Sequence, residues 1–163
     1  MSAELPGTLK VVTVWLLAGL LLFVGVQAWQ HRAVQARFQV DGSAIELQRG
    51  PDGHYHWPGS VNGREVDFLV DTGATGTALP ESLARELGLE SLGEMASDTA
   101  GGRVTGRVVR ADLVLRGGVR VQRLPMLALP GLADRPLLGM DVLGRLSWRQ
   151  VDGVLRIEGG GPR

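Results

Sequence analysis

The residues best suited to chemistry in this sequence are Asp71, Thr72 and Gly73. They directly follow residues 66–70, in which apolar side chains alternate toward one face as they do in a half-buried strand. An ionised carboxylate at the end of a buried strand is costly unless hydrogen-bond partners satisfy it. The Thr72 hydroxyl can donate and accept hydrogen bonds, and Gly73 permits a tight turn that presents backbone N–H groups to the carboxylate. The three residues are therefore a candidate for acid–base chemistry, although the same tripeptide is also common in structural turns.

Two histidines and a second aspartate are the other candidates. His54 and His56 lie two residues apart, would share one face of a strand and could bind a metal ion. Because neither a cysteine nor an acidic cluster completes a ligand set, the sequence favours surface or packing histidines over a metal site at this position. Asp141 follows Gly139 closely in the sequence. Its position favours the first turn of a short helix, where a carboxylate interacts well with the helix dipole, over a second catalytic acid.

Composition restricts the class of protein. The 163 residues suffice for one domain and hardly for two. Hydrophobic residues make up 44% and charged residues 21%, which excludes a disordered or fibrous chain. The chain has 17 basic and 17 acidic residues, and this neutral balance argues against a nucleic-acid-binding protein. It has no cysteine, so disulfides, thiolate metal sites and cysteine nucleophiles are excluded.

An uncharged apolar run covers residues 11–28. A helix of that length rises about 27 Å, which is enough to cross a thin bilayer. The sequence therefore predicts a transmembrane anchor over 11–29 behind an N-terminal tail of residues 1–10, and a cleaved signal peptide is the alternative. Lys10 precedes the run, whereas Arg32 and Arg37 follow it. This small difference in charge by itself favours a cytoplasmic C-terminal domain.

The rest of the chain predicts a small all-β domain, either a barrel or a sandwich. Residues 30–50 are expected to form a stem with some β character, residues 51–158 the domain, and residues 159–163 a frayed tail. One short helix is expected over 80–87, ended by Gly88, and another over 140–146. Hairpin dipeptides occur at 52–53, 62–63 and 152–153. The other expected β segments are a polar, glycine-rich hairpin over 96–109, strands over 109–115 and 119–129, and a final hairpin over 146–157.

Four segments, taken together, resemble the retropepsin-like aspartic peptidases. Residues 68–75 read FLVDTGAT, and residues 80–89, PESLARELGL, are similar to the helix that follows the active-site loop in the bacterial branch of that family. The hairpin over 96–109 stands where the flap of the family stands, and residues 136–140, PLLGM, resemble its second signature. With the apolar run in front, the chain is similar to the membrane-anchored, single-motif aspartic peptidases of bacteria. The resemblance covers about residues 52 to 158.

The resemblance implies a closed β-barrel with one or two short helices, and an endopeptidase that acts on peptides or proteins without a metal or cofactor. Because the chain has one Asp-Thr-Gly, it implies a homodimer in which water is activated between the two Asp71 carboxylates. It also implies a single-pass protein of the bacterial inner (cytoplasmic) membrane with the catalytic domain outside, in the periplasm. A non-catalytic peptide-binding module and an envelope scaffold are the alternatives. The implied residues are catalytic Asp71; loop residues Thr72, Gly73 and Ala74; flap residues Ala100, Gly101, Gly102 and Arg103; and second-signature residues Leu137, Leu138 and Gly139.

Overall fold

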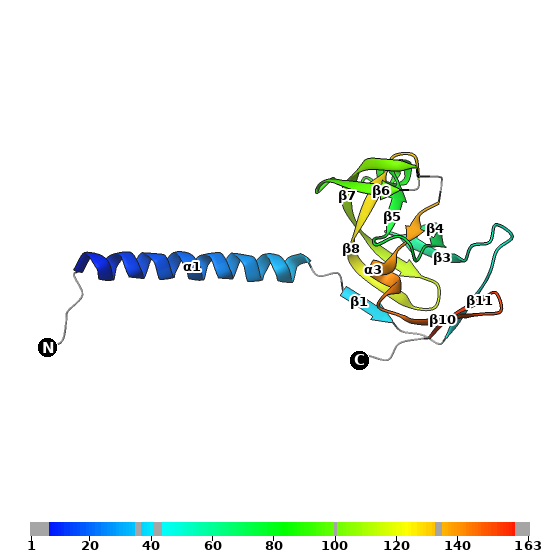
Figure 1. Ribbon diagram of the computed structural model, residues 1–163, viewed down its shortest axis with the longest axis horizontal. Coiled ribbons are helices and arrows are strands. Elements are labelled where there is room, and N and C mark those ends of the chain that lie inside the picture. The colour runs from blue at the N-terminus through cyan, green and yellow to red at the C-terminus, as the bar shows by residue number, and fades with distance from the viewer. Residues whose placement is uncertain (1–6, 35–36, 41–43, 100, 133–134, 159–163) are drawn as a thin grey trace. The chain divides into compact units, whose positions relative to one another are not determined.

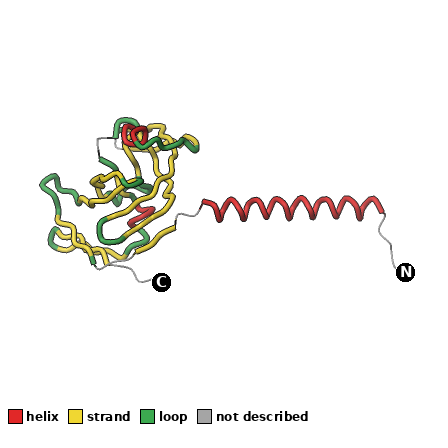
Figure 2. The backbone as a smooth tube through the Cα atoms, turned by 180° about the vertical axis from the view of Figure 1, so that it is seen from behind, coloured by secondary structure: helices red, strands yellow, loops and turns green. Residues whose placement is uncertain are grey.

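The computed structural model describes the backbone of residues 7–34, 37–40, 44–99, 101–132 and 135–158 (Figures 1 and 2). The chain divides into two units, Met1–Gln35 and Ala36–Arg163. The first contains the helix α1 (Gly7–Val34), which includes the helix expected over 11–29. Among the residues that the structure describes, no helix combines the length and the apolar character that crossing a membrane requires. The predicted tails lie wholly or largely outside the description, which leaves out residues 1–6 and 159–163.

The second unit is built almost entirely from strands. One sheet has the order β1-β8-β5-β9-β4-β3-β7-β6, and β7 also pairs with β8, so that the strands from β8 to β7 close into a barrel. A second sheet has the order β10-β11-β2. The predicted closed β-barrel with one or two short helices is therefore confirmed, and the short helices are two, α2 and α3. The elements are β1 (Arg37–Val40), β2 (Ile45–Gln48), β3 (His56–Val61), β4 (Arg64–Val70), β5 (Ala78–Pro80), α2 (Glu81–Glu86), β6 (Gly93–Thr99), β7 (Gly102–Leu115), β8 (Val119–Leu129), β9 (Leu137–Leu138), α3 (Met140–Leu143), β10 (Ser147–Val151) and β11 (Val154–Glu158).

The core fills the inside of the barrel with large apolar side chains. Trp57 on β3 lies directly opposite Phe68 on β4, and neither has any exposed surface. Leu79, Leu113 and Leu138 bring β5, β7 and β9 into the same cluster. Burying a large apolar side chain is worth about 1.5–3 kcal/mol. The end of β4, where Asp71 begins its loop, is thus attached to the buried core of the barrel.

Two of the three predicted hairpin dipeptides join neighbouring strands. The pairs at 62–63 and 152–153 connect β3 to β4 and β10 to β11, and all four of these residues have positive φ, as a tight two-residue hairpin turn requires. The pair at 52–53 also lies in a turn, but only a single bridge, between Arg49 and Tyr55, joins its two sides. The reason is that β2 pairs with β11 while β3 pairs with β4, so the chain passes from one sheet to the other at this turn.

The segment expected to be a stem contributes a strand to each sheet. β1 pairs with β8, and its Phe38 and Val40 pack against the core, while β2 pairs with β11.

The expected hairpin over 96–109 is longer than predicted, because the strand expected separately over 109–115 is the inner half of β7. That inner half pairs with β3 and β8, and the outer half pairs with β6. Of the two helices, α2 ends before Gly88 as expected, and α3 is shorter than the predicted 140–146 because it closes at Gly144.

Candidate active site

Asp71 begins the loop that leaves β4 at residues 71–77. The backbone N–H of Gly73 donates a hydrogen bond of 2.8 Å to Asp71 Oδ1, and the N–H of Ala74 donates one of 3.3 Å to the Asp71 carbonyl. The turn predicted at Gly73, which directs a backbone N–H to the carboxylate, is therefore confirmed. The Asp71 side chain is half-buried and one of its two carboxylate oxygens is held by the loop itself. A carboxylate held in this way can present its other oxygen to a reacting group.

The second signature lies directly beside this loop. β9 runs parallel to the end of β4, with Leu137 opposite Leu69 and Leu138 opposite Val70. The Asp71 N–H donates to the Leu138 carbonyl at 3.0 Å, so the first residue of the loop is hydrogen-bonded to the buried strand β9. The structure thus brings together the loop residues and the packing residues that the sequence predicted separately.

At Gly139 the second signature passes close to the backbone of the Asp71 loop. A Cβ at this position would lie 2.4 Å from the Gly76 carbonyl carbon, 2.5 Å from the Gly76 oxygen and 2.9 Å from the Thr77 nitrogen. Distances this short to backbone atoms leave no room for a side chain unless the loop moves. Glycine is therefore required here by the close approach of two backbones.

Thr77 and Asp141 form a polar connection that the sequence analysis did not identify. The Thr77 hydroxyl, on a side chain that is 1% exposed, donates to Asp141 Oδ1 at 2.8 Å and accepts from the Gly139 N–H at 3.3 Å. Asp141 lies in the first turn of α3 as predicted, and its Oδ1 also accepts the Val142 N–H. The available signal was a threonine directly before the apolar residues of β5, because a buried hydroxyl needs a hydrogen-bond partner.

In the single chain, the Thr72 side chain and the second carboxylate oxygen of Asp71, Oδ2, remain available for further hydrogen bonds. Thr72 is exposed. Within the part of the chain that the structure describes, neither the Thr72 hydroxyl nor Asp71 Oδ2 has a hydrogen-bond partner. The chain contributes one carboxylate to this site, in line with its single Asp-Thr-Gly.

Three of the four predicted flap residues, Gly101, Gly102 and Arg103, lie at the end of the β6–β7 hairpin, which Figure 1 shows. Gly101, Gly102 and Arg103 are exposed, and Ala100 lies outside the described residues. The tip is closed by the Thr99 hydroxyl, which donates to the Gly102 carbonyl at 2.7 Å. β7 pairs with β8 only from Arg107 inward, so the outer hairpin is held by β6 alone. Among the described residues, no hydrogen bond joins this tip to the Asp71 loop.

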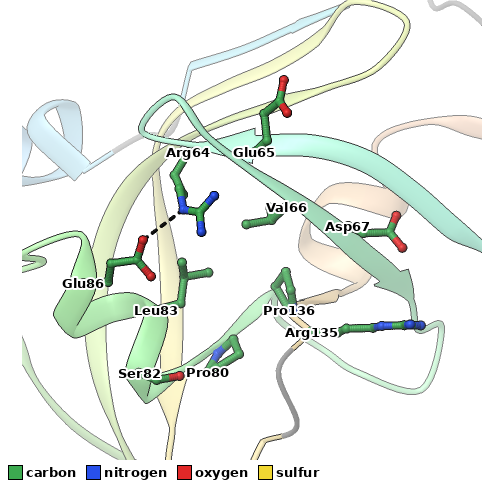
Figure 3. Close-up of a pocket in the computed structure, with 10 residues that line it drawn as sticks. All are labelled: Arg64, Glu65, Val66, Asp67, Pro80, Ser82, Leu83, Glu86, Arg135 and Pro136. Carbon is green, nitrogen blue, oxygen red and sulfur yellow. Dashed lines mark hydrogen bonds and ion pairs between the residues drawn. The ribbon is translucent and has the colours of Figure 1, made fainter.

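A pocket of about 300 Å³ lies between β4, α2 and the approach to β9 (Figure 3). Arg64 and Glu86 form an ion pair of 2.9 Å at one side of it. Asp71 does not line this pocket, which is therefore distinct from the candidate active site. The lining residues are Arg64, Glu65, Val66, Asp67, Pro80, Ser82, Leu83, Glu86, Arg135 and Pro136.

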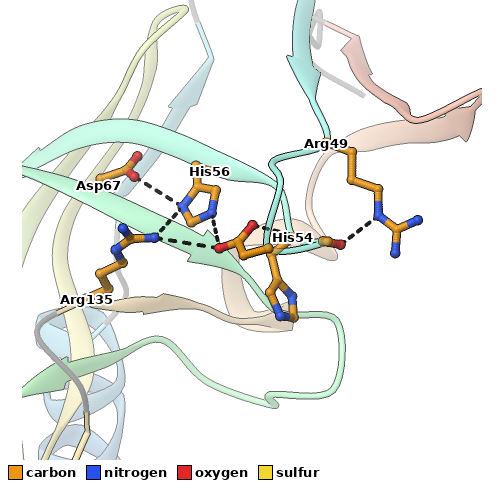
Figure 4. A network of polar contacts seen from close by, with 7 residues as sticks. Arg49, His54, His56, Asp67 and Arg135 are labelled. Atoms are coloured by element: carbon orange, nitrogen blue, oxygen red, sulfur yellow. Dashed lines mark hydrogen bonds and ion pairs between the residues drawn. The ribbon is translucent and has the colours of Figure 1, made fainter.

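The histidines take different positions in the structure. His56 lies between two carboxylates, with Nε2 2.8 Å from Asp52 Oδ2 and Nδ1 3.1 Å from Asp67 Oδ2, while the His54 ring points away from them (Figure 4). The pKa of the Asp52 carboxyl is lowered, first because the His54 backbone N–H donates to it and then because the His56 ring does. In the described part of the chain, no group of three or more His, Asp or Glu side chains is arranged to hold a metal ion.

The chain matches a family described as aspartyl proteases, and it is similar to two proteins whose names state no activity. The family described as gag-polyprotein putative aspartyl protease matches residues 57–145, more than half of the chain. The Sinorhizobium sp. protein named "Uncharacterized protein in cobV 5'region" is 30% identical over 111 residues, which are 66% of this chain and 48% of that protein. The "Uncharacterized protein RP867" of Rickettsia prowazekii (strain Madrid E) is 27% identical over 135 residues, 78% of this chain and 58% of that protein. The chain thus spans about half the length of these relatives.

A solved structure shows the same fold. The crystal structure of a retropepsin-like aspartic protease from Rickettsia conorii matches 76% of this chain and 93% of its own, with a TM-score of 0.56 and 24% identity. The match to the family over residues 57–145 includes the Asp71 loop, β9 and α3. The chain therefore belongs to the gag-polyprotein putative aspartyl protease family, and its fold is retropepsin-like.

Proposed function

We propose that this protein is an aspartic endopeptidase whose active site forms when two copies of the chain place their Asp71 carboxylates on opposite sides of one water molecule. The observation that carries the proposal is the position of Asp71. Its loop is hydrogen-bonded to a buried strand, one oxygen is held by the Gly73 N–H, and the chain supplies no second Asp-Thr-Gly.

The chemistry requires two carboxylates with different protonation states. Two carboxyl groups that face one water cannot both ionise cheaply, so the pair shares a proton. The ionised member accepts a proton from the water, and the protonated member donates one to the carbonyl oxygen of the peptide bond. The resulting hydroxide attacks the carbonyl carbon. Symmetric dimers provide such a pair from one gene product, because the same residue from each subunit lies next to the two-fold axis.

Thr72 supports the dimeric arrangement. An exposed hydroxyl without a partner in the described single chain is available to hydrogen-bond across a two-fold axis. In the proposed dimer, the Thr72 hydroxyl of each subunit braces the loop of the other, and the β6–β7 hairpin covers an extended peptide. Water exclusion by such a cover strengthens electrostatic interactions in the site.

The test is cleavage of a peptide library by the full-length protein in detergent, beside Asp71→Asn. Asn is nearly isosteric with Asp and can keep the Gly73 hydrogen bond, but it cannot accept the proton. Loss of one general acid or base costs about 10²–10⁴-fold, and a homodimer loses both carboxylates at once. The proposal predicts cleavage by the parent and none by the variant, with the same circular dichroism spectrum. A parent that retains peptides uncut would indicate a binding module, and one that neither cuts nor binds would indicate a scaffold.

A mixing experiment tests the shared site directly. If subunits exchange freely and each active site needs two intact Asp71 carboxylates, then adding an equal amount of Asp71→Asn to a fixed amount of parent should leave about half of the activity. A ninefold excess should leave about one tenth. Added Asp71→Asn that leaves the rate unchanged, with subunit exchange shown by energy transfer between labelled copies, would contradict a site shared between subunits.

We propose further that residues 11–29 anchor the protein in a bacterial cytoplasmic membrane, with the peptidase domain on the outer side. The support comes from the uncharged apolar sequence of 11–28, which includes Val11 and Ala28, whose side chains lie outside the description. The apolar side chains described along α1 are all exposed, with Trp15, Leu21 and Leu22 above 70%. A helix that is apolar on every side needs an apolar environment to cover it.

Membrane fractionation and a reporter fusion test the anchor and its orientation. The protein should remain with the membrane after an alkaline carbonate wash, and an alkaline phosphatase fused after Arg163 should be active. Sequencing of the mature N-terminus distinguishes an anchor from a cleaved signal peptide. A carbonate-soluble protein with its apolar run intact would contradict the anchor, and an inactive phosphatase fusion would reverse the orientation.

A further inference from the structure

Three exposed arginines surround β1 at the edge of the larger sheet. Arg120 lies opposite Gln39 in the pairing of β8 with β1, and Arg123 lies just beyond the end of that pairing. The guanidinium carbon of Arg145 lies 5.6 Å from the centre of the Phe38 ring, which also belongs to β1. All three arginines are exposed. We refer to Arg120, Arg123 and Arg145 together as the basic face.

A β-bulge keeps Arg123 on the outside of the barrel. The register of β7 and β8 shifts between Ala111 and Leu113, where β8 has two residues opposite the single Asp112. The Arg123 backbone has a φ of 54°, and its N–H donates to Asp112 Oδ1 at 2.7 Å. Strict alternation along β8 would turn Arg123 inward, but the bulge leaves it exposed and returns Leu124 to the core. The fold therefore adds a second arginine to the surface beside β1.

The arginines of the basic face have no acidic partners in the described part of the chain. None of the ion pairs found there includes them. In the sequence, no acidic residue occurs between Asp112 and Asp134. Residues 30–40, which lead from the apolar run through β1, contain Arg32 and Arg37 and no acidic residue either. Positive charge that the chain does not balance attracts an anionic surface.

The length of the chain before β1 limits the distance between this face and the proposed anchor. Only residues 30–36 separate the proposed span over 11–29 from the first residue of β1. Because α1 continues to Val34, this segment covers at most about 15 Å. The polar headgroup layer itself extends about 5–7 Å beyond the hydrocarbon on each side of a bilayer. The basic face therefore lies within reach of lipid headgroups.

We infer that the basic face binds anionic lipid headgroups of the membrane in which α1 is proposed to be anchored, so that the domain rests on the lipid surface beside β1. The inference rests on the proposed anchor as the source of the lipid surface and is independent of the proposed catalysis. Each arginine near an anionic surface raises the ratio of bound to unbound domain by about fivefold. The anchor raises the effective concentration of the surface, so three arginines suffice for binding.

The test uses the full-length protein in lipid nanodiscs, which expose both leaflets and make the result independent of orientation. The chain has no cysteine, so Gln39→Cys provides one site for a nitroxide label on β1, and Ser82→Cys provides one on α2. Replacing about 30% of the phosphatidylcholine by phosphatidylglycerol should lower collisions of an aqueous nickel complex with the label at 39 by about fivefold or more. About 0.5 M sodium chloride should abolish this protection. The label at 82 should not respond to the lipid.

Charge variants test the arginines themselves. Arg120→Gln should lower the ratio of protected to unprotected label at 39 by about fivefold, and together with Arg123→Gln by about 25-fold. Arg85→Gln is the matched control, because it removes the same charge from α2, whose Glu81 pairs with Arg107 at the end of β8 that is distant from β1. It should change the ratio by less than about twofold. If the double variant does not fold, the effect of salt on the parent tests the same charges without a substitution.

Co-elution with nanodiscs of phosphatidylcholine alone measures the anchor separately. Protein that co-elutes with both kinds of nanodisc without lipid-dependent protection would overturn the inference and leave the anchor intact. Protein that binds only anionic nanodiscs, through Arg120 and Arg123, would support the basic face and count against the anchor, whereas binding to neither would overturn both. Protection that is equal in both lipids and grows with the number of chains per nanodisc would identify a second copy as the occupant and overturn the inference. An equal effect of Arg85→Gln and Arg120→Gln would overturn it as well.

Discussion

Substituting Gly139 by alanine should damage the active site more than the fold. Gly139 has φ −93° and ψ −179°, a conformation that alanine adopts without strain, so the substitution tests the steric contact by itself. The new methyl group would lie 2.4 Å from the Gly76 carbonyl carbon, whereas ordinary van der Waals contacts begin at 3.4 Å. The backbone at 76–77 must therefore withdraw by about 1 Å.

That displacement sets the expected magnitudes. Overpacking of this kind costs about 1–3 kcal/mol, and a Tm change of roughly 4 °C per kcal/mol is typical of a domain of this size, so the Tm should fall by about 4–12 °C. The moved segment belongs to the same loop as Asp71, and a misplacement of about 1 Å can cost about 10²-fold in rate. We therefore expect folded protein with a kcat about 100-fold lower and a similar circular dichroism spectrum.

Gly76→Ala is the matched control, because a Cβ there would meet nothing within 4 Å although the residue forms the other half of the same contact. Thermal unfolding and peptide cleavage are measured for the parent and both variants. Gly76→Ala should unfold within about 2 °C of the parent. If Gly139→Ala also unfolds within about 2 °C of the parent and cleaves at the parental rate, the close approach does not constrain the loop and the reasoning is wrong. A Gly76→Ala variant as unstable as Gly139→Ala would contradict it as well.

Two further variants test the polar contacts. Thr77→Val removes a buried hydroxyl with little change of shape, and with it the hydrogen bonds to Asp141 and to the Gly139 N–H. It should therefore lower the free energy of unfolding by about 1–3 kcal/mol in urea titrations. Thr75→Val, at an exposed position, should change that free energy by less than about 0.5 kcal/mol. An equal effect of both would count against the role of Thr77. Because folding lowers the pKa of Asp52 from 3.8, its carboxylate stabilises the protein above that pH, and the stabilisation is lost as the pH falls through the folded pKa. Asp52→Asn should therefore be less stable than the parent near pH 5 and approach it under strong acid, and a difference in Tm that stays constant down to about pH 2 would refute the linkage.

Local signals in the sequence were sufficient for the turns and for the candidate catalytic residue. A two-residue hairpin turn requires positive φ, which Asn, Asp and Gly adopt more readily than other residues. The dipeptides at 62–63 and 152–153 have this conformation, and they predicted their hairpins correctly. Gly73 and Asp71 are two residues apart, and their hydrogen bond depends on nothing further along the chain. The motif around Asp71 was therefore readable before the fold was known.

Strand pairing between distant segments could not be predicted from local sequence in the same way. The segment expected as a stem contains β character, but which sheet it joins depends on the exposed edges of β8 and β11, which only the folded barrel creates. The expected hairpin over 96–109 was too short for a similar reason. Nothing in the residues near 109 shows that one strand exchanges its partner β6 for β3 and β8 along its length.

The sequence by itself determined the all-β class, the hairpin turns at 62–63 and 152–153, and the choice of Asp71 as the candidate catalytic residue. Each of these depends on residues close together in the chain. The tertiary structure alone placed Gly139 against Gly76, joined Thr77 to Asp141 across 64 residues of sequence, and set His56 between two carboxylates. Such contacts arise when strands far apart in the chain become neighbours in the barrel. Their distances are fixed by packing, which no local pattern of residue types encodes.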